Sequence, residues 1–221
     1  MIRKAEFSPF IGNDYPTTDG RPMAETDFHR LLMTELIETL MDYYAEKSNV
    51  YVTGNILLFY EEGNKRRHIS PDVMVVFGVP KEPRLNYRVW HEGKGPSVVI
   101  ELTSSSTRRE DRTKKWVLYR DVLKVSEYFL FDPFGDYLEP RFQGFRLIGG
   151  EYRRIRETEQ RMKSAKLGLV LEQDGDKLRF ANPVDGVRLP TREERMHIAE
   201  AEVQRLRQII EDREREDTER R

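Results

Sequence analysis

The spacing of apolar residues in the first half of the chain predicts one long helix followed by strands. Residues 24–47 carry apolar side chains three or four positions apart, which is typical of an amphipathic helix. Residues 49–61 have a strand-like pattern. Two β-branched runs, at 72–77 and 97–102, are apolar on both faces, as the central strands of a sheet are.

The second half continues this alternation and completes a mixed α/β pattern, which places the chain in the α+β class. A second helix is predicted over 107–123, because Thr107 and Glu110 form a capping-box pattern at its start. Gly149–Gly150 marks the turn of a meander. A further strand is predicted over 126–133, and the meander covers 137–158. Residues 166–183 form a last strand, an acidic turn and an edge strand.

Composition changes after Pro190, beyond which the chain has no Pro or Gly and is mostly Glu and Arg. We therefore predict a domain over 1–190 and a charged helical tail over 191–221. Apolar residues of the tail alternate at spacings of three and four, the pattern of a short coiled coil. About two clean heptads are marginal for autonomous pairing, so a homodimer through this helix and a solvated terminal helix are both open. The seam residues are Met196, Ala199, Val203, Leu206 and Ile210.

Charge and cysteine content restrict the function classes. The formal net charge of −1 gives no global electrostatic argument for nucleic acid, so such an argument rests on local clusters. The absence of cysteine excludes disulfides and thiolate metal sites. The first residues lack the apolar segment of a secretion signal, and no stretch approaches the roughly 18 apolar residues that span a bilayer. We expect a soluble, cytoplasmic protein with no membrane partner.

Two carboxylates lie at the ends of the predicted central strands. Asp72 follows Pro71, which cannot donate to a strand ladder and so marks a strand entry. Glu101 closes an apolar run in which every neighbour predicts burial, and a buried carboxylate requires a cation, a metal or a proton. A turn aspartate and a buried ion pair with an arginine are the ordinary structural alternatives.

Lys115 lies on the apolar face of the second predicted helix. At about 100° per residue, it falls within about 60° of Leu118 and Val122. Asp111, one turn earlier, shares this face and can pair with Lys115. Lys114 lies off the face. Most helical lysines are solvated, but this pattern directs Lys115 inward.

Glu35 is a similar exception on the first helix, because it lies inside the apolar stripe near Leu32 and Leu36. It is either a satisfied structural residue or a residue that faces a polar site. Two carboxylates at strand ends, a lysine on the next helix and a third carboxylate suit phosphodiester chemistry. Asp and Glu oxygens bind Mg²⁺, which shares its coordination sphere with phosphate, while an ammonium group orients the attacking water or neutralises charge.

Basic residues next to Glu101 in the sequence suit a phosphate backbone. Further basic clusters occur at 65–67 and 153–156, and a solvated charge run is the ordinary interpretation of each cluster. Only the cluster next to Glu101 is a stronger candidate for binding phosphate, because it adjoins the proposed site. Its members are Arg108, Arg109, Arg112 and Lys114.

Four features in this order resemble a known family: Pro71-Asp72, then Glu101 at a strand end, then "SSSTRREDRTKKWVLY", then "SEYFLFDP". They are similar to the Uma-two family of restriction-endonuclease-like proteins, within the PD-(D/E)XK nuclease superfamily, over roughly residues 20–175. The resemblance implies a restriction-endonuclease-like mixed sheet flanked by helices, and divalent-metal hydrolysis of DNA. It also implies that Asp72 and Glu101 hold the metal.

The resemblance assigns the catalytic lysine to Lys115. The superfamily lysine normally follows the second acid by two positions, which is Thr103 here, whereas this family has it on the following helix. Asp111 and Tyr119 stand four residues either side of Lys115 in the family register, and Glu35 resembles a helix carboxylate that some of these nucleases add. The turn at 104–107 lacks the proline usual in the family, which affects loop shape and not the proposed ligands.

The sequence thus leads to a Mg²⁺- or Mn²⁺-dependent endonuclease that acts on duplex DNA. Two alternatives stay open. One is a nucleic-acid-binding or assembly protein that keeps a nuclease fold without turnover. The other is a hydrolase that acts on RNA or another phosphodiester.

Overall fold

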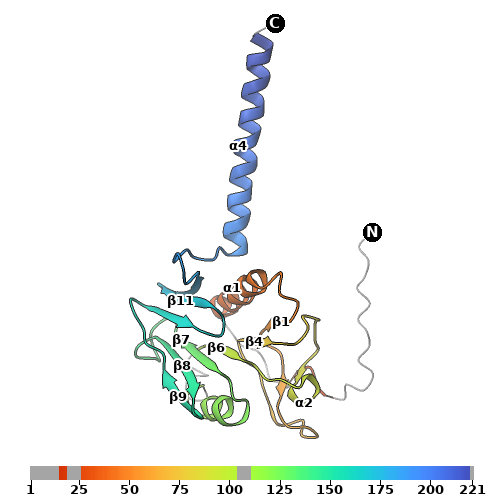
Figure 1. Cartoon of the computed structure of the whole chain (residues 1–221), viewed down its shortest axis with the longest axis vertical. Helices are drawn as coiled ribbons and strands as arrows, with labels where there is room; N and C mark the ends of the chain where they lie inside the picture. The colour runs from red at the N-terminus through yellow and green to blue at the C-terminus, as the bar shows by residue number, and fades with distance from the viewer. Residues whose placement is uncertain (1–14, 19–25, 104–110, 220–221) are drawn as a thin grey trace.

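A six-stranded mixed sheet forms the centre of the structure (Figure 1). The structure is a computed structural model and describes residues 15–18, 26–103 and 111–219. In chain order the described elements are α1 (Asp27–Tyr43), β1 (Val50–Thr53), β2 (Leu58–Phe59), β3 (His68–Ile69), β4 (Val73–Phe77), β5 (Tyr87–Arg88), α2 (Val89–Glu92), β6 (Val98–Leu102), η1 (Asp111–Lys115), η2 (Leu118–Val122), β7 (Glu127–Phe131), β8 (Phe142–Ile148), β9 (Glu151–Arg154), β10 (Arg161–Ser164), β11 (Leu169–Asp174), β12 (Lys177–Ala181) and α4 (Arg192–Glu219).

The strand order of the central sheet is β1-β4-β6-β7-β8-β9. Only the pairing of β6 with β7 is parallel within this sheet, and its other pairs are antiparallel. Two three-stranded sheets, β3-β2-β5 and β10-β11-β12, accompany it. The predicted turn at Gly149–Gly150 joins β8 to β9, with positive φ at both glycines, as a two-residue hairpin turn requires. The mixed sheets and helices confirm the α+β fold class.

Apolar side chains cover both faces of the central sheet, which explains the continuous apolar runs of β4 and β6. On one face, α1 packs Leu32 and Leu36 against the sheet together with residues of β10–β12 such as Phe180. On the other face, the helical segment 111–122 and the β3-β2-β5 sheet enclose a second cluster that includes Tyr119 and Tyr128. The sheet is therefore a middle layer, and polar groups on it need partners from the layers above and below.

The run predicted as one strand at 49–61 is divided between two sheets. β1 pairs with β4, whereas β2 pairs with β3 and β5. The chain changes direction at Gly54, where an added Cβ would lie 1.8 Å from the carbonyl oxygen of Asp72. The amide of Asn55 donates to the Pro71 carbonyl at 2.8 Å. Glycine at this position lets β1 end in contact with the strand entry that carries Asp72.

The second predicted helix has wider turns than expected. Its two halves, η1 and η2, have i→i+5 hydrogen bonding, so each turn holds more residues than the 3.6 of an α-helix. The predicted inward face is therefore partly wrong, since Val122 is 51% exposed and Leu118 is only half-buried. Lys115, Tyr119 and Leu123, four residues apart, are buried instead.

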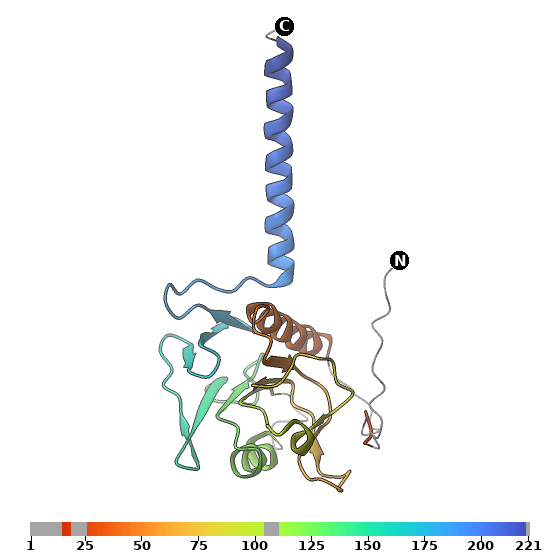
Figure 2. The same ribbon diagram turned by 45° about the vertical axis from the view of Figure 1, so that its right-hand side comes forward.

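The predicted helical tail forms α4, which projects away from the sheets (Figure 1 and Figure 2). Thr191 and Glu194 form its capping box, with the Glu194 amide 3.1 Å from Thr191 Oγ1 and the Thr191 amide 2.8 Å from the Glu194 carboxylate. Arg192 and Arg195 at its base both contact the carboxylate of Asp42 on α1. Within the described ranges, no helix combines the length and apolar character needed to cross a membrane.

Candidate active site

Asp72 and Glu101 meet at the end of the central sheet. β4 and β6 are antiparallel neighbours in which Val73 pairs with Ile100, so the residues just outside this pair face each other. The Leu102 amide donates to Asp72 Oδ2 at 2.7 Å, and the Asp72 amide lies 3.4 Å from Glu101 Oε2. Main-chain groups of one strand thus bind the side chain of the other, and the structure brings the two acids together.

Glu101 is fully buried and takes its partners from the helical segment. Lys115 Nζ lies 2.9 Å from Glu101 Oε2, and the Tyr119 hydroxyl donates to Glu101 Oε1 at 2.5 Å. Lys115 itself is only 8% exposed. A buried carboxylate is costly without such partners. The cation predicted for Glu101 is therefore Lys115.

Tyr119 was present in the family register but was not among the predicted site residues. Burial, and next the charge of Glu101, raise the pKa of Tyr119 well above its ordinary value. Its hydroxyl therefore stays protonated and remains a donor to Glu101. The four-residue spacing from Lys115, together with the need of Glu101 for a second partner, was the sequence signal for this role.

His29, on the first turn of α1, approaches the carboxylate of Asp72 from the face of the sheet opposite Lys115 and Tyr119. Its Nε2 lies 3.4 Å from Asp72 Oδ2, and both side chains are largely buried. Burial alone would raise the pKa of Asp72, but the adjacent His29 and the charge of Lys115 outweigh that effect and hold it below its ordinary value. Asp72 is thus kept as a carboxylate.

The structure does not bring every predicted residue into this group. Glu35 lies on α1, but its Oε2 accepts from Lys177 Nζ of β12 at 3.1 Å. Its partner among the described residues therefore belongs to the β10-β11-β12 sheet. Arg108 and Arg109 lie outside the described residues. Asp111 and Arg112 begin η1, but their side chains lie outside the described part of the chain.

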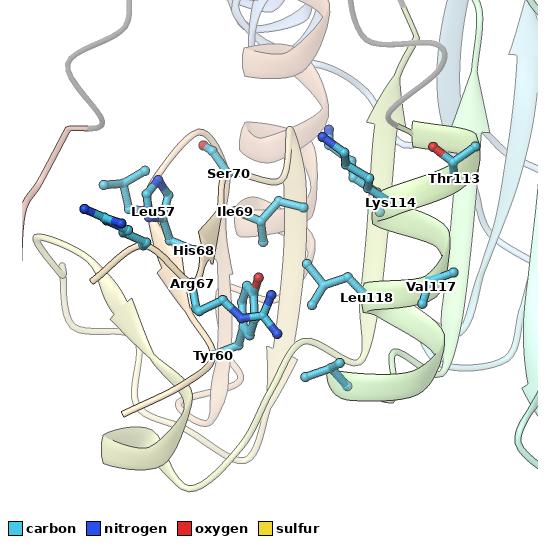
Figure 3. Close-up of a pocket in the computed structure, with 13 residues that line it drawn as sticks. Leu57, Tyr60, Arg67, His68, Ile69, Ser70, Thr113, Lys114, Val117 and Leu118 are labelled. Carbon is cyan, nitrogen blue, oxygen red and sulfur yellow. The ribbon is translucent and has the colours of Figure 1, made fainter. Parts of the chain in front are cut away.

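A cleft of about 860 Å³ has Lys115 in its lining. One wall is the β2–β3 hairpin, residues 57–70, and the other is the helical segment 113–122; we call it the hairpin–helix cleft (Figure 3). Lys115 lines the cleft and also binds Glu101, so this one side chain links the cleft to the acidic pair, which lies behind the lining. Lys114 lines the helical wall, and Arg66 and Arg67 line the hairpin wall. Two members of the basic cluster at 65–67, Arg66 and Arg67, therefore line the cleft, although in the sequence this cluster does not adjoin Glu101.

The Uma2 family model, described as "Putative restriction endonuclease", matches residues 14–176, most of the 221 residues. The chain belongs to the Uma2 family. The match includes Asp72, Glu101, Lys115 and Tyr119, and the family description supports a nuclease-like function.

Two individual proteins are similar to this Uma2-family chain. An uncharacterized protein of Synechocystis sp. is 27% identical over 105 residues, which are 48% of this chain and 52% of that protein. The chain therefore spans about half the length of the curated relative that it matches. A crystal structure from Anabaena variabilis, described as "a putative nuclease belonging to DUF820", has a TM-score of 0.47 at 15% identity, over 68% of this chain and 81% of the other.

The donor atoms of this Uma2-family site fit a hard divalent cation. Asp72 and Glu101 offer adjacent carboxylates, the ligand type that Mg²⁺ and Mn²⁺ prefer. Thr103 Oγ1, two residues beyond Glu101, is buried without a hydrogen-bond partner among the described residues, as beside a bound ion with its waters. No three acidic or histidine side chains in the described ranges are grouped as ligands, so water and phosphate oxygens would complete the sphere.

The buried pair makes a prediction for stability. Lys115→Met should lower the free energy of unfolding by about 3–5 kcal/mol, because Glu101 would lose its cation while remaining buried. Adding Glu101→Gln should restore part of this loss, since the remaining amide carries no charge. Urea unfolding of the wild type, both single variants and the double variant measures the coupling.

Lys114→Met is the matched control, because Lys114 is exposed and has no ion-pair partner among the described residues. It should change the free energy of unfolding by less than about 0.5 kcal/mol. If the change in unfolding free energy of the double variant equals the sum of the Lys115→Met and Glu101→Gln changes within about 0.5 kcal/mol, the pairing is contradicted.

Proposed function

We propose that the chain is a divalent-metal-dependent endonuclease that hydrolyses phosphodiester bonds of DNA in the cytoplasm. The observation that carries this proposal is the pair of adjacent carboxylates, Asp72 and Glu101, held by Lys115 beside a basic cleft. Membership in a family described as "Putative restriction endonuclease" is consistent with it. The arrangement supplies a negative site for a metal and a positive surface for phosphate within one region.

Each residue has a defined part in this proposal. Asp72 and Glu101 would hold Mg²⁺ or Mn²⁺, which supplies an acidified water and offsets negative charge on the phosphate. Lys115 Nζ lies 2.9 Å from Glu101 Oε2 and Lys115 also lines the cleft, so its ammonium group would orient water or a phosphate oxygen there. Tyr119 fixes the rotamer of Glu101, and His29 keeps Asp72 in place.

One observation favours a second candidate, a DNA-binding protein without turnover. Glu101 already accepts hydrogen bonds at both oxygens, and among the described residues no third acidic ligand joins the pair. A site that is complete as an ion-pair network would bind nucleic acid through its cleft without hydrolysing it. Activity in the presence of metal distinguishes the two candidates.

The proposed activity predicts metal-dependent cleavage of duplex plasmid and linear DNA with Mg²⁺ or Mn²⁺, and none in EDTA. Asp72→Asn and Glu101→Gln should each reduce the rate at least about a hundredfold, because each removes a charged ligand while keeping the side-chain shape. Gel analysis of the products over time measures the rates.

Glu35→Gln is the control, since its carboxylate lies with Lys177 on β12. It should retain a rate near that of the wild type. Unchanged cleavage in Asp72→Asn would contradict the assignment of the site.

We further propose that α4 pairs with the same helix of a second copy. Val203, Leu206 and Ile210 are 46%, 46% and 56% exposed along one seam. β-branched residues at the a positions, Val203 and Ile210, with Leu206 at d favour a parallel two-stranded coiled coil. In that arrangement Glu202 would face Arg207 of the second copy, a favourable charge pair. A dimer would present two sites, as cutting both strands requires.

Val203→Glu with Leu206→Glu should therefore yield a monomer, because two charges would enter the seam. The matched control is Gln204→Glu with Gln208→Glu, which adds the same charge on the outer face of α4 and should leave the dimer intact. Sedimentation equilibrium separates the 26.2 kDa monomer from a species of twice that mass. A wild-type monomer at all concentrations, or equal masses for both variants, would contradict the pairing.

A further inference from the structure

We propose that the hairpin–helix cleft binds an unpaired nucleotide next to the phosphate to be cut, so that the preferred substrate is single-stranded DNA or DNA with an unpaired segment. This inference rests on the proposed function, since it names the form of DNA that the site accepts. It concerns the apolar and aromatic side chains that line the cleft, which have no part in the catalytic proposal.

The position and size of the cleft suit one or two nucleotides. Its volume of about 860 Å³ lies within the range of pockets that enclose small ligands. Lys115 connects it directly to Glu101. A nucleotide in the cleft would therefore lie beside Lys115, one side chain away from Glu101.

The apolar part of the lining is the first argument for a base. Val117 and Val122 are 50% and 51% exposed and belong to the lining of the cleft on its helical wall. Half-buried Ile69 lines it from the hairpin (Figure 3). Side chains of this kind gain nothing from phosphate oxygens, which dominate contacts with a duplex backbone. They do gain from the face of a base that is out of its stack.

Planar side chains are the second argument. Tyr60 lines the cleft, and the guanidinium of Arg67 lies 5.5 Å from the centre of its ring. Figure 3 shows Arg67 and Tyr60 side by side on the hairpin wall. Aromatic rings and guanidinium planes are the surfaces on which unpaired bases stack in proteins that bind single strands.

Cations on opposite walls are the third argument. Arg66 on the hairpin and Lys114 on the helix both line the cleft, are exposed, and have no ion-pair partner among the described residues. They can therefore contact phosphates on either side of an inserted base. Cations that flank a stacking surface are the combination found where proteins track a single strand.

The test measures binding of the full chain in EDTA, which removes cleavage from the comparison. Fluorescence anisotropy with a labelled single strand, the same sequence as a blunt duplex, and a duplex with an unpaired flap gives three dissociation constants. The inference predicts that the single strand and the flap bind at least tenfold more tightly than the blunt duplex. Equal binding of all three, tighter binding of the blunt duplex, or no binding of any of them would overturn it.

Variants show whether the cleft causes the preference. Tyr60→Leu and Val117→Ser should each weaken binding of the single strand by about five- to a hundredfold, the range expected for loss of one stacked base, and leave duplex binding unchanged. Val184→Ser is the matched control, because Val184 is 92% exposed and lies outside the cleft. Equal loss for single strand and duplex in Tyr60→Leu and Val117→Ser would also overturn the inference.

The two proposals fail in different ways. If no metal supports cleavage but the single-strand preference remains and depends on Tyr60, the proposed hydrolysis is wrong and the cleft assignment stands. If blunt duplex is cleaved and bound as well as the flap, hydrolysis stands and the cleft assignment is wrong.

Discussion

The burial of Glu101 is the constraint on which the rest of the site depends. A carboxylate in the middle layer of the molecule, at the end of a fully buried strand, needs donors from the layer that covers it. Lys115 and Tyr119 supply them from one helical segment, and the Asp72 amide supplies a third from the adjacent strand. The site is therefore part of the folded core rather than an addition to its surface.

This constraint also connects the acidic pair to the cleft. The wide turns of η1 and η2 align Lys115 with Tyr119 toward Glu101, and they leave Val117 and Val122 exposed in the lining of the cleft. One helical segment thus completes the acidic site with its inner face and forms a wall of the cleft with its outer one. Wide turns of this kind frequently occur at functional sites.

Much of the sheet and the two acids could be predicted from the sequence, because local patterns determine them. The apolar runs of β4 and β6, the proline before Asp72 and the two-glycine turn each have a local physical cause. Val122 was wrongly predicted to face inward, because the wide helical turns of η1 and η2 depend on packing and cannot be inferred from the spacing of apolar residues. The partnership of Glu35 with Lys177 joins residues 142 positions apart, and the approach of Arg66 to the site depends on how the hairpin folds. Neither contact can be predicted from the neighbouring residues in the sequence.

Calorimetric titration of Mn²⁺ tests the central claim most directly, because it asks whether the Asp72–Glu101 pair is a metal site before any substrate is known. The wild type and the Asp72→Asn, Glu101→Gln double variant would be titrated under the same conditions, with circular dichroism to verify that both are folded. The account predicts binding to the wild type that is lost in the folded double variant. Binding that persists in the double variant, or no binding to the wild type with or without single-stranded DNA, would contradict it.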